Sequence, residues 1–199
     1  MQIFLRIMNQ FLPVLFWICL IFGFEEPEIA ILTIVAAIIH EGGHIAFLRI
    51  RGIKGHKLRG VVSGFRIRAS SILTYKDEML LYLSGPIANI CAALMLALFD
   101  SDITRMLCAL NIATAISNLL PVEGYDGYGA LRSIIEMLGG GFGERILDGV
   151  SAGIVFSLCI LSIYFIDRFG SGYWIFGIFF FSMLGQLSKW LKNVKSEDL

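Results

Sequence analysis

The strongest chemical signature in the sequence is a cluster of three ionisable residues, His40, Glu41 and His44, in the pattern H-E-x-x-H. The pattern lies inside an apolar stretch, Ala36 to Leu48. In a helix, residues four positions apart share a face, so both imidazoles can bind one metal ion while Glu41 lies beside it. Two histidines and a third protein ligand would leave one position for water, whose proton a nearby carboxylate can accept. The spacing therefore predicts a hydrolytic zinc site with Glu41 as the base.

The apolar surroundings favour this interpretation over a coincidental match. An ionisable residue inside a membrane-spanning helix costs about 3 kcal/mol on insertion scales, and such residues usually mark a functional site. Two of the three histidines of the chain lie in the pattern. Gly42 and Gly43 each cost a helix about 1 kcal/mol relative to alanine. They therefore indicate that another backbone, of a substrate or of a neighbouring helix, comes close.

Spacing alone does not choose the third ligand. Ile50 stands six positions after His44, where the metzincin pattern has a histidine. His56 is expected to be a solvated loop residue. The remaining candidates are acids at the ends of apolar segments on the side of the two histidines: Asp77, Glu78, Glu123, Asp126 and Glu136.

The segment from Asn118 to Gly127 favours one of these acids as the third ligand, because of the way its helix is interrupted. Pro121 and Gly124 interrupt an apolar helix there. A broken helix at membrane depth is tolerated only where protein or a wet cavity satisfies the freed backbone groups. Such a break next to an acid is typical of a functional site in a membrane protein.

The composition predicts a membrane protein. The 199 residues are 57% hydrophobic and only 16% charged, which is too apolar for an ordinary soluble domain. The 16 Lys and Arg residues balance 16 Asp and Glu residues, so the charge indicates no nucleic-acid partner. No C-x-x-C pair occurs, and packing inside apolar segments is the expected role of Cys19, Cys91, Cys108 and Cys159.

Six apolar segments approach the roughly 20 residues that a helix needs to cross about 30 Å of hydrocarbon. They are Phe11 to Phe24, Ile29 to Leu48, Leu80 to Phe99, Ile103 to Leu120, Ile146 to Ile166, and Tyr173 to Leu191. The expected fold is an all-α polytopic membrane protein with six transmembrane helices, forming a single domain over residues 1–199.

Basic residues predict the orientation of these helices. The loop of residues 49–76 contains eight Lys and Arg residues and no acid, so it is expected on the cytoplasmic side. Alternation then puts both termini in the cytoplasm and leaves only Arg105 and Arg168 outside. Within the loop, Phe65 to Ala69 alternates apolar and basic residues, which predicts a short hairpin at the membrane surface. A plain basic loop that contacts anionic lipid is the alternative.

Four motifs in this order resemble the site-2 protease family of intramembrane zinc metalloproteases: His40-Glu41-x-x-His44, Ser84-Gly85-Pro86-Ile87-Ala88-Asn89, Asn118-x-x-Pro121 and Asp126-Gly127. They lie in a core of about residues 29–130. The resemblance implies that His40, His44 and Asp126 bind one zinc ion and that Glu41 activates water. It also implies that Asn118 helps to hold the substrate, a membrane-tethered protein cut in or near a transmembrane segment.

Six helices with cytoplasmic ends resemble the sporulation-type members, which release a membrane-tethered pro-sigma factor in regulated intramembrane proteolysis. This implies a bacterial inner or forespore-surrounding membrane, and an inhibitory membrane protein as a further partner. We expect neither a PDZ domain nor a cystathionine-beta-synthase-type domain. Tyr125 and Tyr128 flank Asp126-Gly127 where the family more often has leucine and glycine.

The residues leave two other functions open. A zinc transporter or sensor would bind metal without needing Glu41, and an inactive relative would bind transmembrane helices without cutting them. Three neighbouring features have structural explanations of their own. Asn89 is expected to form an interhelical hydrogen bond, Gly85-Pro86 to allow close packing or a kink, and Glu123 to be a surface acid.

Overall fold

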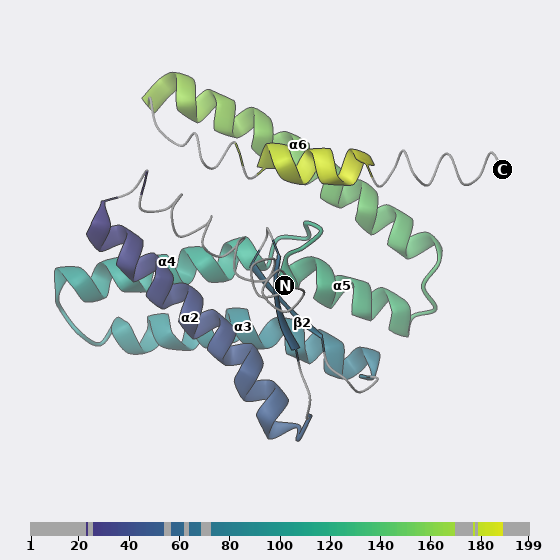
Figure 1. Cartoon of the computed structure of the whole chain (residues 1–199), viewed down its shortest axis with the longest axis horizontal. Helices are drawn as coiled ribbons and strands as arrows, with labels where there is room; N and C mark the ends of the chain where they lie inside the picture. The colour runs from purple at the N-terminus through teal and green to yellow at the C-terminus, as the bar shows by residue number, and fades with distance from the viewer. Residues whose placement is uncertain are drawn as a thin grey trace, which may run out of the picture.

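The computed structural model describes residues 26–53, 57–61, 64–68, 73–169 and 179–188, together with Gly23 and Gly177. The elements of this part follow in the order α2 (Pro27–Ile50), β1 (Lys57–Val61), β2 (Gly64–Arg68), α3 (Tyr75–Leu96), α4 (Asp102–Asn118), α5 (Asp126–Met137) and α6 (Phe142–Phe169) (Figure 1). A short apolar helix, Phe179–Ser188, follows them. The first predicted segment, Phe11 to Phe24, lies outside the described residues apart from Gly23.

Local chemistry explains where the helices begin and end. Pro27 occupies the first turn of α2, where its missing N–H costs nothing. Gly52, with φ of 68°, turns the chain out of α2 in the left-handed conformation that glycine adopts most easily. At the start of α4, the Ser101 hydroxyl accepts from the Thr104 backbone N–H and the Thr104 hydroxyl accepts from the Ser101 N–H. Proline, glycine and a capping box thus explain the two ends of α2 and the start of α4.

Three described helices are long and apolar enough to cross a membrane: α2, α3 and residues Phe142–Arg168 of α6. They correspond to the second, third and fifth predicted segments. The fourth segment forms α4, which has 17 residues and is about 26 Å long at 1.5 Å per residue. Within the sixth segment, the described helix is Phe179–Ser188. Helix α4 ends at Asn118, two residues before the predicted end of its segment, whereas the residues on either side of Phe179–Ser188 in the sixth segment, apart from Gly177, lie outside the described part of the chain.

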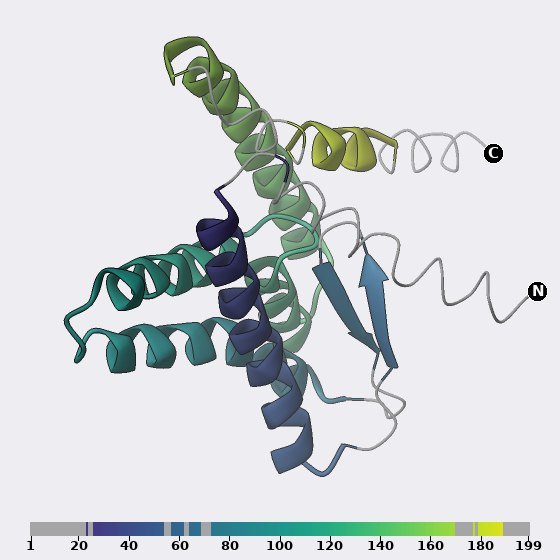
Figure 2. The ribbon, with the colours of Figure 1, turned by 60° about the vertical axis from the view of Figure 1, so that its left-hand side comes forward.

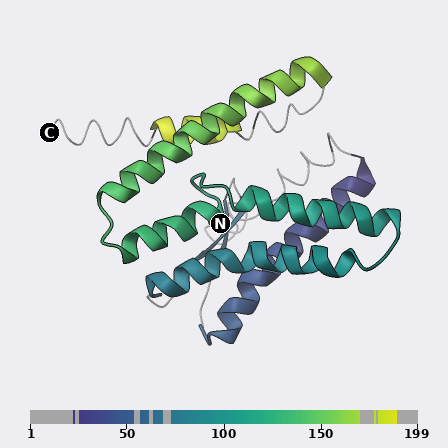
Figure 3. The same ribbon diagram turned by 180° about the vertical axis from the view of Figure 1, so that it is seen from behind.

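Helix α3 lies at the centre of the arrangement and packs against α2, α4 and α5. Figure 2 shows α3 and α4 side by side as an antiparallel pair, with α2 crossing them steeply. From behind, α5 lies beyond the end of α4, and α6 runs across the molecule from the far end of α5 (Figure 3). In the basic loop, β1 and β2 pair antiparallel, with Lys57 opposite Arg68 and Val61 opposite Gly64.

Small and polar residues fill the places where the helices cross. The fully or nearly buried side chains there include Ala36, Ala93, Ala115, His40, His44, Asn89 and Asn111. Large apolar side chains point outward instead, such as Ile38 and Leu94, which are 65% and 67% exposed. This distribution is typical of membrane helices, because lipid accepts apolar surface and small residues let the backbones approach.

Gly43 allows α2 and α3 to approach each other closely. A Cβ atom on Gly43 would lie 2.4 Å from the Ser84 backbone oxygen and 2.7 Å from the Ala88 Cβ. A Cβ on Gly42 would meet nothing within 4 Å. The helix-packing interpretation of the glycine pair is therefore confirmed for Gly43, whereas Gly42 faces open space beside Glu41.

Candidate metal centre

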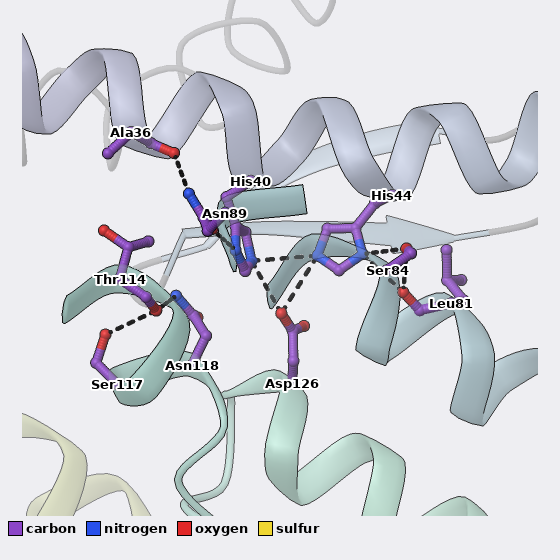
Figure 4. A network of polar contacts seen from close by, with 10 residues as sticks. All are labelled: Ala36, His40, His44, Leu81, Ser84, Asn89, Thr114, Ser117, Asn118 and Asp126. Atoms are coloured by element: carbon purple, nitrogen blue, oxygen red, sulfur yellow. Dashed lines mark hydrogen bonds and ion pairs between the residues drawn. The ribbon is translucent and has the colours of Figure 1, made fainter. Parts of the chain in front are cut away.

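Helix α2 places His40 and His44 one turn apart on the face that packs against α3. Both residues are only 6% exposed. Their rings lie edge to face with centroids 4.9 Å apart, and the two Nε2 atoms are separated by 3.2 Å. Helical spacing has thus brought the two imidazoles to one point, as the H-E-x-x-H pattern predicted (Figure 4).

The outer nitrogen of each ring is held by a hydrogen-bond acceptor on α3. His40 Nδ1 lies 2.8 Å from the Asn89 Oδ1 atom. His44 Nδ1 lies 2.8 Å from the Leu81 backbone oxygen and 3.2 Å from the Ser84 hydroxyl. A carbonyl oxygen can only accept, so each Nδ1 donates its proton. In the neutral ring, this leaves the Nε2 lone pair free to bind a metal ion.

Asp126 is the third member of the cluster, and a bend in the chain between α4 and α5 places it next to the histidines. Pro121 lies in this connection, and Gly124 has φ of 101°. Asp126 is the first residue of α5. Gly127 lets the start of α5 lie against the end of α4, because a Cβ there would overlap the Leu119 backbone oxygen at 2.1 Å. The predicted break in the fourth segment therefore delivers the carboxylate to the histidines.

The three ligand atoms fit a zinc ion. Asp126 Oδ2 lies 2.9 Å from His40 Nε2 and 3.3 Å from His44 Nε2. A tetrahedral zinc centre with bonds of about 2.0–2.1 Å separates its ligand atoms by about 3.3 Å, which is close to the three distances observed. With both Nδ1 atoms donating outward, three electron-rich atoms face one another. Asp126 Oδ2 is buried and has no hydrogen-bond partner among the described residues, so a cation would satisfy all three groups.

Glu41 lies beside this cluster on the same turn of α2. Its Oε2 atom is buried and has no hydrogen-bond partner in the described part of the chain. Gly42 follows Glu41 in the chain, and a Cβ atom added there would meet nothing within 4 Å. A buried carboxylate oxygen without a donor is suited to accept a proton from a water molecule.

Gly85 makes room for the two rings. A Cβ at this position would lie 2.5 Å from His44 Nε2 and 2.8 Å from His40 Cε1. Real side chains do not tolerate such distances, and both atoms belong to the cluster. The close-packing interpretation of Gly85-Pro86 is therefore confirmed, with the His40 and His44 rings themselves as the packing partner.

Other sequence candidates lie apart from the cluster. His40, His44 and Asp126 are the group found among the described residues that could hold a metal ion. Asp77 forms an ion pair with Arg51 at 3.1 Å. The backbone N–H of Glu123 donates to the Ser151 hydroxyl at 2.9 Å. His56 lies outside the described residues.

Asn118, the predicted substrate-binding residue, lies at the end of α4 on the same side of α2 as Asp126 (Figure 4). Its Nδ2 atom donates to the Thr114 backbone oxygen, one turn earlier in α4, at 3.0 Å. The side chain is partly exposed. Its role in holding a substrate stays a prediction.

Sequence reasoning missed the groups that orient the histidines. Asn89 is expected to link helices, which it does, but its oxygen also contacts the His40 ring. Ser84 lies in the same motif and its hydroxyl contacts His44. The Leu81 carbonyl belongs to the backbone and has no sequence signal. Polar residues inside an apolar segment were the available signal for the other two.

The described fold and cluster define a helical protein with membrane-length helices and a centre of two imidazoles and one carboxylate. The chain has the fold of a site-2 protease, since it is similar to the structure of the Site-2 Protease from Methanocaldococcus jannaschii with a TM-score of 0.61. The similarity covers 91% of this chain and 87% of that one, at 21% sequence identity. No protein-family model matches the chain, and no curated protein matches it. The likeness does not distinguish subgroups, so the sporulation-type assignment stays a prediction.

Proposed function

We propose that this chain is an intramembrane zinc metalloprotease that cleaves a membrane-tethered protein in or near its transmembrane segment. The observation that supports it most is the convergence of His40 Nε2, His44 Nε2 and Asp126 Oδ2 at mutual distances of 2.9–3.3 Å. A buried, unpartnered Glu41 carboxylate oxygen beside them supports catalysis rather than metal storage. The fold of a site-2 protease supports the same function.

The residues divide the work as follows. His40, His44 and Asp126 hold a zinc ion, which when bound polarises both a water molecule and a peptide carbonyl. Glu41 takes the proton of the water as the water oxygen attacks the carbonyl carbon. Glu41 then gives this proton to the departing amine as the C–N bond breaks, so that an acid and an amine are the products. Asn118 holds the extended substrate next to the centre.

The depth of the centre suits a cut near a membrane face. His44 precedes the last residue of α2, Ile50, by six positions, which is about 9 Å along a helix. The basic loop follows directly, and we propose that this face is cytoplasmic. A helical substrate hides its peptide bonds in its own hydrogen bonds, so it must unwind before attack. An outer edge of the β1–β2 hairpin then offers the extended segment a strand to pair with.

The decisive experiment uses the purified chain in detergent, with its metal content measured, and candidate single-span substrates with and without a chelator. Cleavage should require one bound zinc ion per chain and stop when the metal is removed. The variant Glu41→Gln should keep the metal and the fold yet lower cleavage by about 10²–10⁴-fold, because it cannot accept a proton. Glu78→Gln is the matched control, since Glu78 is a partly buried acid at the start of α3; its activity should not change.

The alternatives give other results. A zinc transporter or sensor would bind metal equally well in both variants and cut nothing. An inactive helix-binding protein would retain the substrate without producing fragments. Full cleavage by Glu41→Gln would reject Glu41 as the base while leaving the metal site intact.

A further inference from the structure

A line of buried amide groups leads from α4 through α3 to the metal-binding face of α2. Asn111 Nδ2 donates to the Leu107 backbone oxygen at 2.8 Å. Asn89 Nδ2 donates to Asn111 Oδ1 at 2.7 Å and to the Ala36 backbone oxygen at 2.9 Å. Asn89 Oδ1 lies 2.8 Å from His40 Nδ1, as Figure 4 shows for the Ala36, Asn89 and His40 side of the line. Both asparagines are 0% exposed.

The direction of every hydrogen bond in this line is determined. The Leu107 carbonyl can only accept, so Asn111 presents its Nδ2 to it and its Oδ1 to Asn89. Asn89 must then present its Nδ2 to two acceptors, Asn111 Oδ1 and the Ala36 carbonyl. The Oδ1 atom of Asn89 then faces His40. Because this oxygen can only accept, His40 must donate to it from Nδ1. A flipped Asn89 amide would face both acceptors with an oxygen, an arrangement that is costly for buried groups.

We propose that Asn111 is a positioning residue which, through Asn89, keeps the proton of His40 on Nδ1 and the Nε2 lone pair turned toward the metal centre. The inference rests on the metal site of the proposed function. It gives α4 a second role, because the helix that leads into the Asp126 connection also orients a ligand on α2. Partners of a metal-binding histidine change metal affinity by about 10–100-fold when removed.

A role in packing alone does not explain the arrangement. The surrounding crossings are filled by alanine and glycine, such as Ala93 and Ala115, which are 4% and 1% exposed. Two fully buried amides are a poor choice for filling space in such a place, because each needs partners on both ends. Here the backbone oxygens of Ala36 and Leu107 and the His40 ring fulfil that need. Asn89 and Asn111 therefore set the direction of the hydrogen bonds that end at His40, in addition to filling space between the helices.

The test compares four variants with the wild type, all as the full chain in detergent. Asn89→Leu removes the contact with His40, and Asn111→Leu removes the acceptor that helps to orient Asn89. Asn111→Asp is nearly isosteric and still accepts from Asn89 in either protonation state. Thr114→Val, on the same helix, removes a hydroxyl that donates only to its own helix, at the Leu110 oxygen, and serves as the matched control.

Two quantities are measured. Zinc affinity, from competition with a chelating dye, should fall about 100-fold in Asn89→Leu and about tenfold in Asn111→Leu. It should stay at the wild-type value in Asn111→Asp and Thr114→Val. The ring-nitrogen NMR shifts of ¹⁵N-histidine, in a chain with three histidines, report the tautomer. Metal-free wild type should carry the His40 proton on Nδ1, and Asn111→Leu should show a mixture of tautomers.

The outcomes separate the two hypotheses. A wild type that binds no zinc refutes the proposed function, whereas the tautomer of His40 still decides the role of the asparagines. A His40 proton on Nε2 in the metal-free wild type overturns the inference, even if the leucine variants do not fold. An unchanged tautomer in folded Asn111→Leu overturns it as well, since a loss of affinity would then reflect packing alone.

Discussion

Two clusters of ionisable side chains lie at opposite ends of the α3–α4 pair, and their differences show what marks a site. At the turn between these helices, Arg105 lies 2.6 Å from Asp100 and 2.7 Å from Asp102. These contacts are shorter than the 2.9 Å and 3.3 Å that join Asp126 to the two histidines of the metal centre. Short distance is therefore not what distinguishes the metal centre.

Burial and the balance of donors and acceptors distinguish it. The side chains of Arg105, Asp100 and Asp102 are 63%, 90% and 96% exposed, so water satisfies whatever they leave unpaired. In the metal centre, the side chain of Asp126 is 15% exposed, and its Oδ2 atom has no hydrogen-bond partner among the described residues. A group of buried acceptors without a donor is costly unless a cation compensates it. The comparison predicts that removing a charged side chain from the metal centre strongly affects zinc binding, whereas removing one from the exposed turn between α3 and α4 has little effect on zinc binding or stability.

The largest effect should come from Asp126→Ala. The change removes one of three ligands, so zinc affinity should fall by more than the roughly 10–100-fold typical of residues that only support a ligand. Metal analysis after dialysis should find one zinc ion per wild-type chain and almost none in the variant. Asp100→Ala, the matched loss of an acid at the other end of the α3–α4 pair, should retain its zinc. Unchanged stoichiometry in Asp126→Ala would assign the third ligand to another residue.

The second-largest effect should come from Gly85→Ala, which fills the space around the two histidine rings. In Gly85→Ala, the new methyl group would overlap the His44 ring, and overpacking of this kind costs about 1–3 kcal/mol. The rings must move, so zinc affinity and thermal stability should both decrease. Gly42→Ala is the matched control, because its methyl group would enter open space and should stabilise the helix by about 1 kcal/mol. Equal melting temperatures for the two variants would contradict the packing around Gly85.

The parts of the centre that could be predicted are those that depend on local spacing. His40 and His44 share a face because four residues make about one helical turn, whatever α2 packs against. Glu41 follows from the same turn. Asp126 is one of five acids allowed by position. The break at Pro121 and Gly124 favours its segment, which also contains Glu123, and only the resemblance to a family selects Asp126 itself.

The orienting groups could not be predicted, since they depend on which helix faces which. Asn89 is 49 positions from His40, and no local pattern indicates that its oxygen faces that ring. The Leu81 carbonyl is a backbone group that every residue type carries. Hydropathy located α2, α3 and α6 because their apolar stretches are long. It gave no indication of α5, Asp126–Met137, a short helix with one buried face formed by small residues such as Gly129, Ala130 and Ser133.

The smallest effect should come from Arg105→Ala, which removes both ion pairs at the exposed end of the α3–α4 pair. Exposed pairs contribute only about 0–1 kcal/mol, and salt screens them. The start of α4 should stay in place, because the reciprocal hydrogen bonds of Ser101 and Thr104 cap the helix without the arginine. Thermal unfolding in detergent at low and at high salt measures the effect: wild type and variant should differ slightly at low salt and converge at high salt, with zinc content unchanged at both. A large loss of stability or of zinc would mean that this turn, despite its exposure, supports the metal centre through α3 and α4.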